Sequence, residues 1–166
     1  MQSKKFIKLV LLFIILCSTN FLNGANRFWI ATSTSNWNST ANWSTTSGGL
    51  SGASVPLSSD IATFNGSGVG SCTINATVNV AGISVVSGYT GTISQGAFVI
   101  TIGTSNASFA AGTFTGGSLA IICNGTFTLS GTSFTSTSDT LHLLSSVTST
   151  WLSSRLHTLK LQAPSP

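Results

Sequence analysis

A weak internal repeat runs through the second half of the chain and limits its possible folds more than any other feature. Phe109–Ser118 aligns with Leu129–Ser138 one repeat later, and Gly91–Ile93 aligns in the same way with Gly112–Phe114. Repeats of roughly 20 residues are typical of a coiling β-solenoid, in which each rung places an equivalent inward side chain on the previous one. The equivalent inward residues are predicted to be Ile93, Phe114 and Phe134.

Short alternating runs of apolar and polar residues indicate strands throughout the chain. Examples are Cys72–Val80 and Phe98–Ile102, and glycine and asparagine separate such runs. Charged residues make up only 5% of the chain. Like charges stacked on adjacent strands about 4.8 Å apart would repel, whereas serine, threonine and asparagine can form hydrogen bonds there. We therefore predict an all-β fold, a right-handed parallel β-helix (β-solenoid) with an N-terminal cap, with a β-sandwich as the alternative.

The N-terminal segment resembles a signal peptide. Lys4, Lys5 and Lys8 precede the apolar run Leu9–Leu16, which is shorter than the roughly 20 residues of a membrane span. A small residue, Ala25, suits the end of such a segment. We predict a signal peptide over residues 1–25 and a location that is extracellular or at the cell surface. Lipid attachment at Cys17 is an alternative mode of anchoring.

The basic character of the chain belongs largely to that segment. Beyond residue 25, Arg27, Arg155 and Lys160 stand against Asp60 and Asp139, which leaves a net charge of +1. Nucleic-acid-binding domains carry a clustered basic surface. We therefore expect no nucleic-acid partner.

Three of the four tryptophans, Trp29, Trp37 and Trp43, lie within a short segment near the start of the mature chain. The first rung of a solenoid exposes an unpaired edge and an open apolar end, which large side chains could cover. We predict an N-terminal Trp-rich cap over residues 26–64, followed by solenoid rungs over 65–166 that are incomplete at the C-terminus. In the alternative interpretation, the three indoles are exposed and stack on sugar rings as a glycan platform.

Catalytic chemistry has few candidate groups. Asp60 and Asp139 are the only carboxylate side chains, and their separation in sequence argues against a paired acid and base. Asp139 and His142 would point to opposite faces of a strand, and His157 has no acidic or cysteine neighbour in the sequence. We expect no enzymatic activity and no cofactor.

Cys72 and Cys123 are the only cysteines after residue 25. Both lie in apolar strand-like runs, which favours small buried side chains over a disulfide bridge, although export would permit a bridge. Neither lies in a CxxC or Cys/His cluster, so no metal site is expected.

The order of several short motifs resembles bacterial secreted parallel β-helix surface proteins, including autotransporter-like and adhesin-like passenger segments. The motifs are Arg27-Phe28-Trp29, Asn36-Trp37, Ala41-Asn42-Trp43-Ser44, Ala53-Ser54-Val55-Pro56, Ser59-Asp60, Phe64, Ser87–Ile93 and Gly112-Thr113-Phe114. The resemblance implies a β-helix that is displayed or released outside the cell, without assigned chemistry.

The expected function is therefore that of a secreted or cell-surface, non-catalytic β-helix protein with a structural or adhesive role. One alternative is a carbohydrate-binding module that uses the N-terminal tryptophans, and another is a remnant of a polysaccharide-degrading β-helix enzyme. The expected partners are a glycan or protein ligand at a cell surface or outside the cell. Because the segment Trp151–Pro166 shows no second cap, we also expect self-association through an open solenoid end, or continuation of the chain into further rungs.

Overall fold

The computed structural model describes residues 24–135 with their side chains, and the strands at 140–143, 147–149 and 158–161 by their backbone. The predicted signal peptide lies outside this part of the chain, except for its last two residues. The described residues contain no helix that is both long and apolar enough to cross a membrane.

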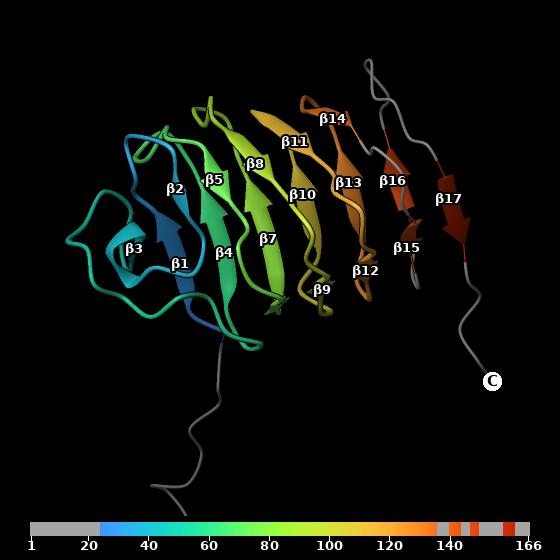
Figure 1. Ribbon diagram of the computed structural model, residues 1–166, viewed down its shortest axis with the longest axis horizontal. Helices are drawn as coiled ribbons and strands as arrows, with labels where there is room; N and C mark the ends of the chain where they lie inside the picture. Colours follow the sequence, from blue (N-terminus) through green and yellow to red (C-terminus); the bar gives the residue numbers. More distant parts are fainter. Residues whose placement is uncertain (1–23, 136–139, 144–146, 150–157, 162–166) are drawn as a thin grey trace, which may run out of the picture.

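The chain winds through three sheets, and successive circuits, called rungs here, stack along one axis (Figure 1). Sheet A contains seven strands, and sheets B and C contain five each. Sheet A consists of β1 (Asn26–Trp29), β3 (Trp43–Ser44), β4 (Ile61–Phe64), β7 (Gly82–Val85), β10 (Ala107–Phe109), β13 (Phe127–Leu129) and β16 (Val147–Ser149). Sheet B consists of β2 (Ser35–Asn36), β5 (Cys72–Thr73), β8 (Thr92–Ser94), β11 (Thr113–Thr115) and β14 (Ser133–Thr135). Sheet C consists of β6 (Val78–Val80), β9 (Ile100–Ile102), β12 (Ile121–Cys123), β15 (Thr140–Leu143) and β17 (Thr158–Leu161).

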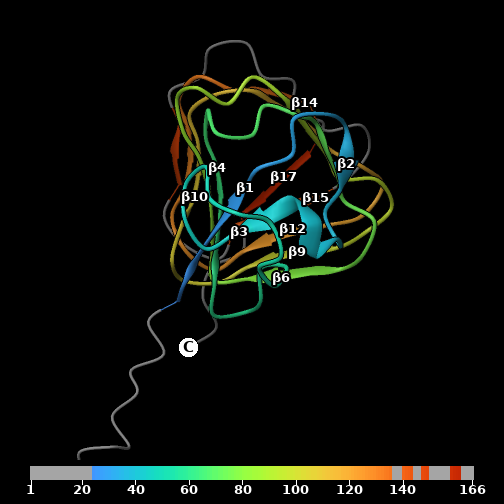
Figure 2. The ribbon, with the colours of Figure 1, turned by 90° about the vertical axis from the view of Figure 1, so that its left-hand side faces the viewer.

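The strand pairing confirms a parallel β-solenoid. Among the strands that the structure describes, each pairs in parallel with the equivalent strand of a neighbouring rung, apart from β3, which pairs antiparallel with β1. Viewed along its axis, the chain encloses a single interior (Figure 2). The β-sandwich alternative is wrong, because its two face-to-face sheets are built from antiparallel strands.

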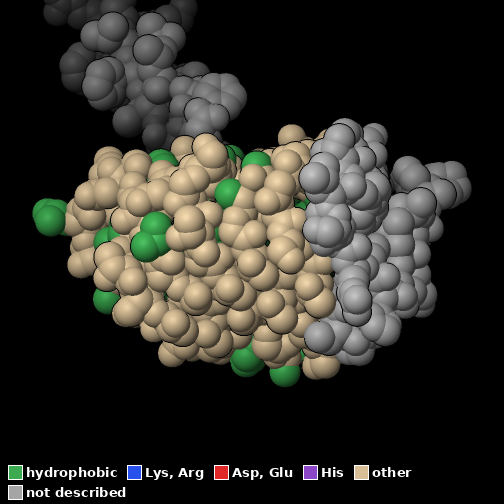
Figure 3. Space-filling model, turned by 90° about the horizontal axis from the view of Figure 1, so that it is seen from above, with side chains coloured by type: hydrophobic (Ala, Val, Ile, Leu, Met, Phe, Trp, Pro, Cys, Tyr) green, Lys and Arg blue, Asp and Glu red, His purple; other side chains and the backbone are tan. Residues whose placement is uncertain are grey.

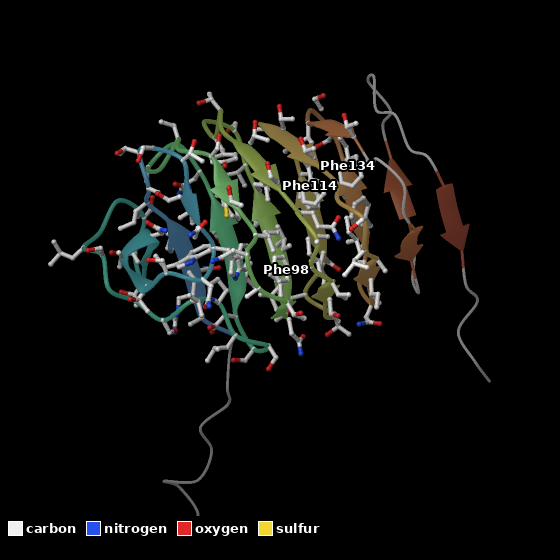
Figure 4. All side chains as sticks on the ribbon, viewed as in Figure 1. Phe98, Phe114 and Phe134 are labelled. Carbon is white, nitrogen blue, oxygen red and sulfur yellow. The ribbon has the colours of Figure 1, made fainter. Side chains whose placement is uncertain are left out.

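The register between rungs follows the repeat in the sequence. Phe114 pairs with Ile93 on one side and with Phe134 on the other. The rings of Phe114 and Phe134 stack with their centroids 4.8 Å apart and their planes 7° from parallel, inside the solenoid (Figure 4). The same offset between rungs holds in sheet A, where Phe109 pairs with Leu129.

The repeats Phe109–Ser118 and Leu129–Ser138 each run into an apolar segment, which predicts strands at Leu119–Ile121 and Leu141–Leu143. The structure places the first of these strands two residues later, at Ile121–Cys123, and pairs Ile121 with Leu141. Leu119 lies before β12 and is 42% exposed. The apolar character of the sequence does not distinguish Leu119, which lies in a connection, from Ile121, which points inward.

Inward and outward side chains alternate along the strands, as the pleat of a β-strand requires. The inward positions are apolar and form one continuous core along the axis. The outward positions of sheet B form two columns of hydroxyl groups in register: Thr92, Thr113 and Ser133, and Thr73, Ser94, Thr115 and Thr135. A solenoid of uncharged rungs can therefore stack without repulsion between neighbouring strands.

Gln95 is a buried polar residue whose side-chain amide forms hydrogen bonds with the backbone of two rungs at a corner of the solenoid. The side chain is 1% exposed, and its Nε2 donates to the carbonyl oxygens of Phe98 (2.9 Å) and Leu119 (2.6 Å). Its Oε1 accepts a hydrogen bond from the backbone N–H of Gly117 at 3.0 Å.

We expect Gln95→Leu to destabilise the fold by about 2–4 kcal/mol, because it removes several buried hydrogen bonds to backbone groups and replaces none of them. Urea unfolding followed by circular dichroism would measure the loss. Gln95→Glu is the matched variant, since it keeps the shape and the acceptor but removes the donor. If the free energy of unfolding of Gln95→Leu equalled that of the unaltered chain, the stability of the corner would not depend on this amide.

Candidate functional site

Four aromatic side chains pack together at the N-terminal end of the solenoid. Trp43 lies at the centre, with ring centroids 5.2 Å from Trp29, 4.9 Å from Trp37 and 5.6 Å from Phe64. The three tryptophans come from the end of β1, the residue after β2 and the start of β3. The cluster continues into the next rung, where Tyr89 lies 5.2 Å from Phe64. The tryptophan cluster is therefore part of the core.

The segment between β2 and β4 crosses the end of the solenoid (Figures 1 and 2). It contains the 3-10 helix η1 (Thr40–Asn42) and then β3, which pairs antiparallel with β1 at the edge of sheet A. Within the segment predicted as the cap, β1 and β4 are themselves strands of the stacked sheet. β2, between them, is a strand of sheet B and pairs in parallel with β5. The covering part is thus the chain between β2 and β4.

The burial of the tryptophans favours the cap interpretation over the glycan platform. Trp29, Trp37 and Trp43 are 0%, 3% and 0% exposed. The Nε1 of Trp29 donates to the carbonyl oxygen of Gly70, and the Nε1 of Trp43 donates to that of Trp37, each at 2.8 Å. A sugar could stack on these rings only if the cap opened.

Asp60 links the cap to the first rungs through hydrogen bonds. Its carboxylate accepts hydrogen bonds from the backbone N–H of Ala25 (3.2 Å) and of Leu57 (3.0 Å). The Nε of Arg27 lies 3.7 Å from the same carboxylate, and only 5% of the Asp60 side chain is exposed. Because each carboxylate oxygen accepts a backbone hydrogen bond, Asp60 has a structural role.

The remaining titratable candidates fall outside the side chains that the structure describes. Asp139 and His157 lie in parts of the chain that are not described, and His142 is described only as part of the backbone of β15. Among the described residues, no three His, Cys, Asp or Glu side chains are grouped closely enough to hold a metal ion. The expectation of a non-enzymatic chain without a cofactor stays a prediction.

Cys72 and Cys123 are both buried and free. Cys72 lies on sheet B and Cys123 on sheet C, two rungs further along. Burial raises the pKa of the Cys72 thiol well above its ordinary value, and burial also raises the pKa of Cys123. The thiolate is the nucleophilic form, so burial keeps both thiols inert.

We expect Ellman's reagent to leave both thiols unmodified in the native chain and to modify both in urea. The measurement uses a Cys17→Ser variant, so that the thiol in the N-terminal segment does not contribute. Rapid modification of either thiol in the native chain would show that its strand opens readily to solvent.

Two grooves of about 410 Å³ each mark the described surface. The first, which we call the Phe28 groove, lies on the outer face of sheet A. It runs from Asn26 and Phe28 to Ser105 and Asn106. The second, the cap groove, lies between Pro56 and Leu57 of the cap and Asn79 of β6, with Trp37 on its wall.

Sequence reasoning singled out Trp37 and missed Phe28 as a groove residue. Phe28 precedes Trp29 on β1, and strand alternation places the two rings on opposite faces. The buried tryptophan therefore predicts an outward phenylalanine, a signal that was present in the sequence.

Comparison of the chain with protein-family models, with curated proteins and with solved structures found no match.

Proposed function

We propose that this chain is exported and acts as a non-catalytic structural or adhesive protein, at the cell surface or outside the cell. The observation that carries the proposal is the chemistry of its surface. Between residues 61 and 135 the sequence contains no charged residue, and the outward positions of the strands are mostly hydroxyl side chains. The face shown in Figure 3 is accordingly made of uncharged polar and backbone atoms with scattered hydrophobic side chains.

The architecture supports a role as surface material. Parallel rungs that share one apolar core give a stiff rod whose length grows with each repeat. The rod presents a hydroxyl-rich face on successive rungs, which suits several weak contacts to an extended partner.

The charged groups of the described region support a non-catalytic role. Arg27 and Asp60 are the only charged residues between 24 and 135, and they contact each other. Both serve the cap, since the Nε of Arg27 also donates to Ser54 Oγ at 3.0 Å.

Export is tested by expressing the full chain with a C-terminal epitope tag in a bacterial host and locating the tag by fractionation and added protease. The matched control is the variant Leu11→Arg/Leu12→Arg, which interrupts the apolar run before Leu16. We expect the unaltered chain outside the cytoplasm and the variant inside. Retention of both chains in the cytoplasm would overturn the proposal.

The adhesive role is tested with beads coated with the exported chain. Such beads should adhere to bacterial or host cells more than beads coated with the heat-denatured chain. Equal adhesion of the two kinds of bead would leave only the structural role.

A further inference from the structure

Phe28 has an unusual position for an aromatic residue in this fold. Among the aromatic side chains of residues 24–135, it is the one that neither belongs to the core nor packs against it. The core does not require it, because Trp29 fills the inward position of β1. A partly exposed phenylalanine ring on an outer sheet face is a contact surface available to a ligand.

The floor of the Phe28 groove is uncharged and combines Ile61 and Ile83 with hydroxyl residues. Thr63, Ser84 and Ser108 lie side by side on β4, β7 and β10, each in register with the next. Phe28 pairs with Thr63 at the N-terminal side of this row. The groove therefore combines apolar surface, which includes the ring of Phe28, with the hydroxyl groups of Ser84 and Ser108, whereas Thr63 is only 9% exposed.

The opposite wall of the Phe28 groove is formed by residues 103–106, a connection between strands that is longer than the equivalent connection one rung earlier. A single residue, Ala81, joins β6 to β7, whereas residues 103–106 join β9 to β10. The longer connection lies over the shorter one, since the N–H of Ser105 donates to the carbonyl oxygen of Ala81 at 3.0 Å. Gly82 leaves room for it, because a Cβ there would lie 2.8 Å from the carbonyl oxygens of Ser105 and Asn106.

Asn106 is held firmly in this wall. Its φ of 71° is the only positive value among non-glycine residues of the described chain. Its carbonyl oxygen accepts from Ile83 N–H at 3.1 Å, and its Oδ1 accepts from Thr126 N–H at 3.0 Å. A backbone in this sparsely populated conformation persists where the surroundings fix it, and such positions cluster at binding sites.

From these features we infer that the Phe28 groove binds a neutral sugar unit of a glycan, with one face of the sugar ring against Phe28. A sugar ring has an apolar face and a rim of hydroxyl groups, which match the ring of Phe28 and the hydroxyl and amide groups around it. Among the described residues no charged side chain lines the groove, so these residues offer nothing to balance an ionic ligand. The volume of about 410 Å³ lies in the range of small-molecule sites, roughly 300–1,000 Å³.

The cap groove fits this ligand less well. Its aromatic residue, Trp37, is only 3% exposed and cannot offer a ring face to a sugar. This inference rests on the proposed adhesive function and names the chemistry of its partner.

The test is a glycan array probed with the exported full chain. The array carries neutral glucans, mannans, galactans and N-acetylhexosamine oligomers, together with sulfated and uronic-acid glycans. We expect binding to neutral glycans, with Kd raised about tenfold or more by Phe28→Ala. Leu57→Ala, an exposed residue of the cap groove, is the matched control and should leave Kd unchanged.

A second variant, Ser84→Lys, fills the floor of the Phe28 groove from an outward position and should also weaken binding. Both variants should keep the melting temperature of the unaltered chain, because neither residue belongs to the core. Binding to no neutral glycan, binding to charged glycans alone, or equal Kd values for Phe28→Ala and the unaltered chain would each overturn the inference. If the chain is found outside the cell and adheres but binds no neutral glycan, this inference fails while the proposed function stands.

Discussion

Replacement of Trp43 by alanine is expected to destabilise the N-terminal end of the solenoid by about 3–5 kcal/mol. The residue is 0% exposed and contacts the rings of Trp29, Trp37 and Phe64, so its loss leaves a cavity that these large side chains cannot easily fill. The variant also loses the hydrogen bond from Trp43 Nε1 to the Trp37 carbonyl oxygen. Urea unfolding followed by far-ultraviolet circular dichroism measures the effect.

Two further variants separate the causes. Trp43→Phe keeps an aromatic ring and removes the indole N–H, so it should cost less than the alanine variant. Leu50→Ala lies in the same covering segment but is 93% exposed, and it should change stability by less than about 0.5 kcal/mol. A Trp43→Ala variant as stable as Leu50→Ala would show that the cluster does not hold the cap in place.

Replacement of Phe114 by alanine is expected to cost a comparable amount, about 3–5 kcal/mol, in the middle of the solenoid. Phe114 is 2% exposed, stacks on Phe134 and meets the edge of Phe109 with a centroid distance of 5.4 Å. Because each rung is stabilised mainly by its neighbours, the loss should loosen the rungs on both sides. Hydrogen exchange of the backbone amides of β8 and β14 would detect that loosening.

The matched control for Phe114 is the next residue in the same strand. Thr115→Val keeps a β-branched side chain at an outward position and should change the free energy of unfolding by less than about 0.5 kcal/mol. If Phe114→Ala and Thr115→Val were equally stable, the stacked aromatic column would not be a source of stability.

Much of the fold could be predicted from the sequence because a solenoid is a nearly local structure. The offset between Phe114 and Phe134 equals the length of one rung, so periodicity alone placed these residues in register. Connections were predicted less well. The exposed Leu119 was placed at the start of a strand that begins at Ile121, because a repeat with connections of variable length does not reveal which apolar residue belongs to the strand.

The candidate site was harder to predict. The sequence drew attention to the tryptophans, but their burial depends on how the segment between β2 and β4 crosses the end of the solenoid. The Phe28 groove joins Asn26 and Phe28 on β1 to Ser105 and Asn106, which precede β10 and lie far along the sequence. No local pattern connects residues at that separation.

The sequence by itself determined the class of fold, since alternation and a repeat of one rung specify strands that stack in parallel around an apolar core. Strand alternation in the sequence puts Phe28 and Trp29 on opposite faces, but the tertiary structure decided that the three tryptophans are buried and that Phe28 stays partly exposed. Trp43 lies in the core, whereas Phe28 lies beside a groove. The physical reason is that exposure depends on which segments cover a strand, and the cap and the connection at residues 103–106 come from elsewhere in the chain.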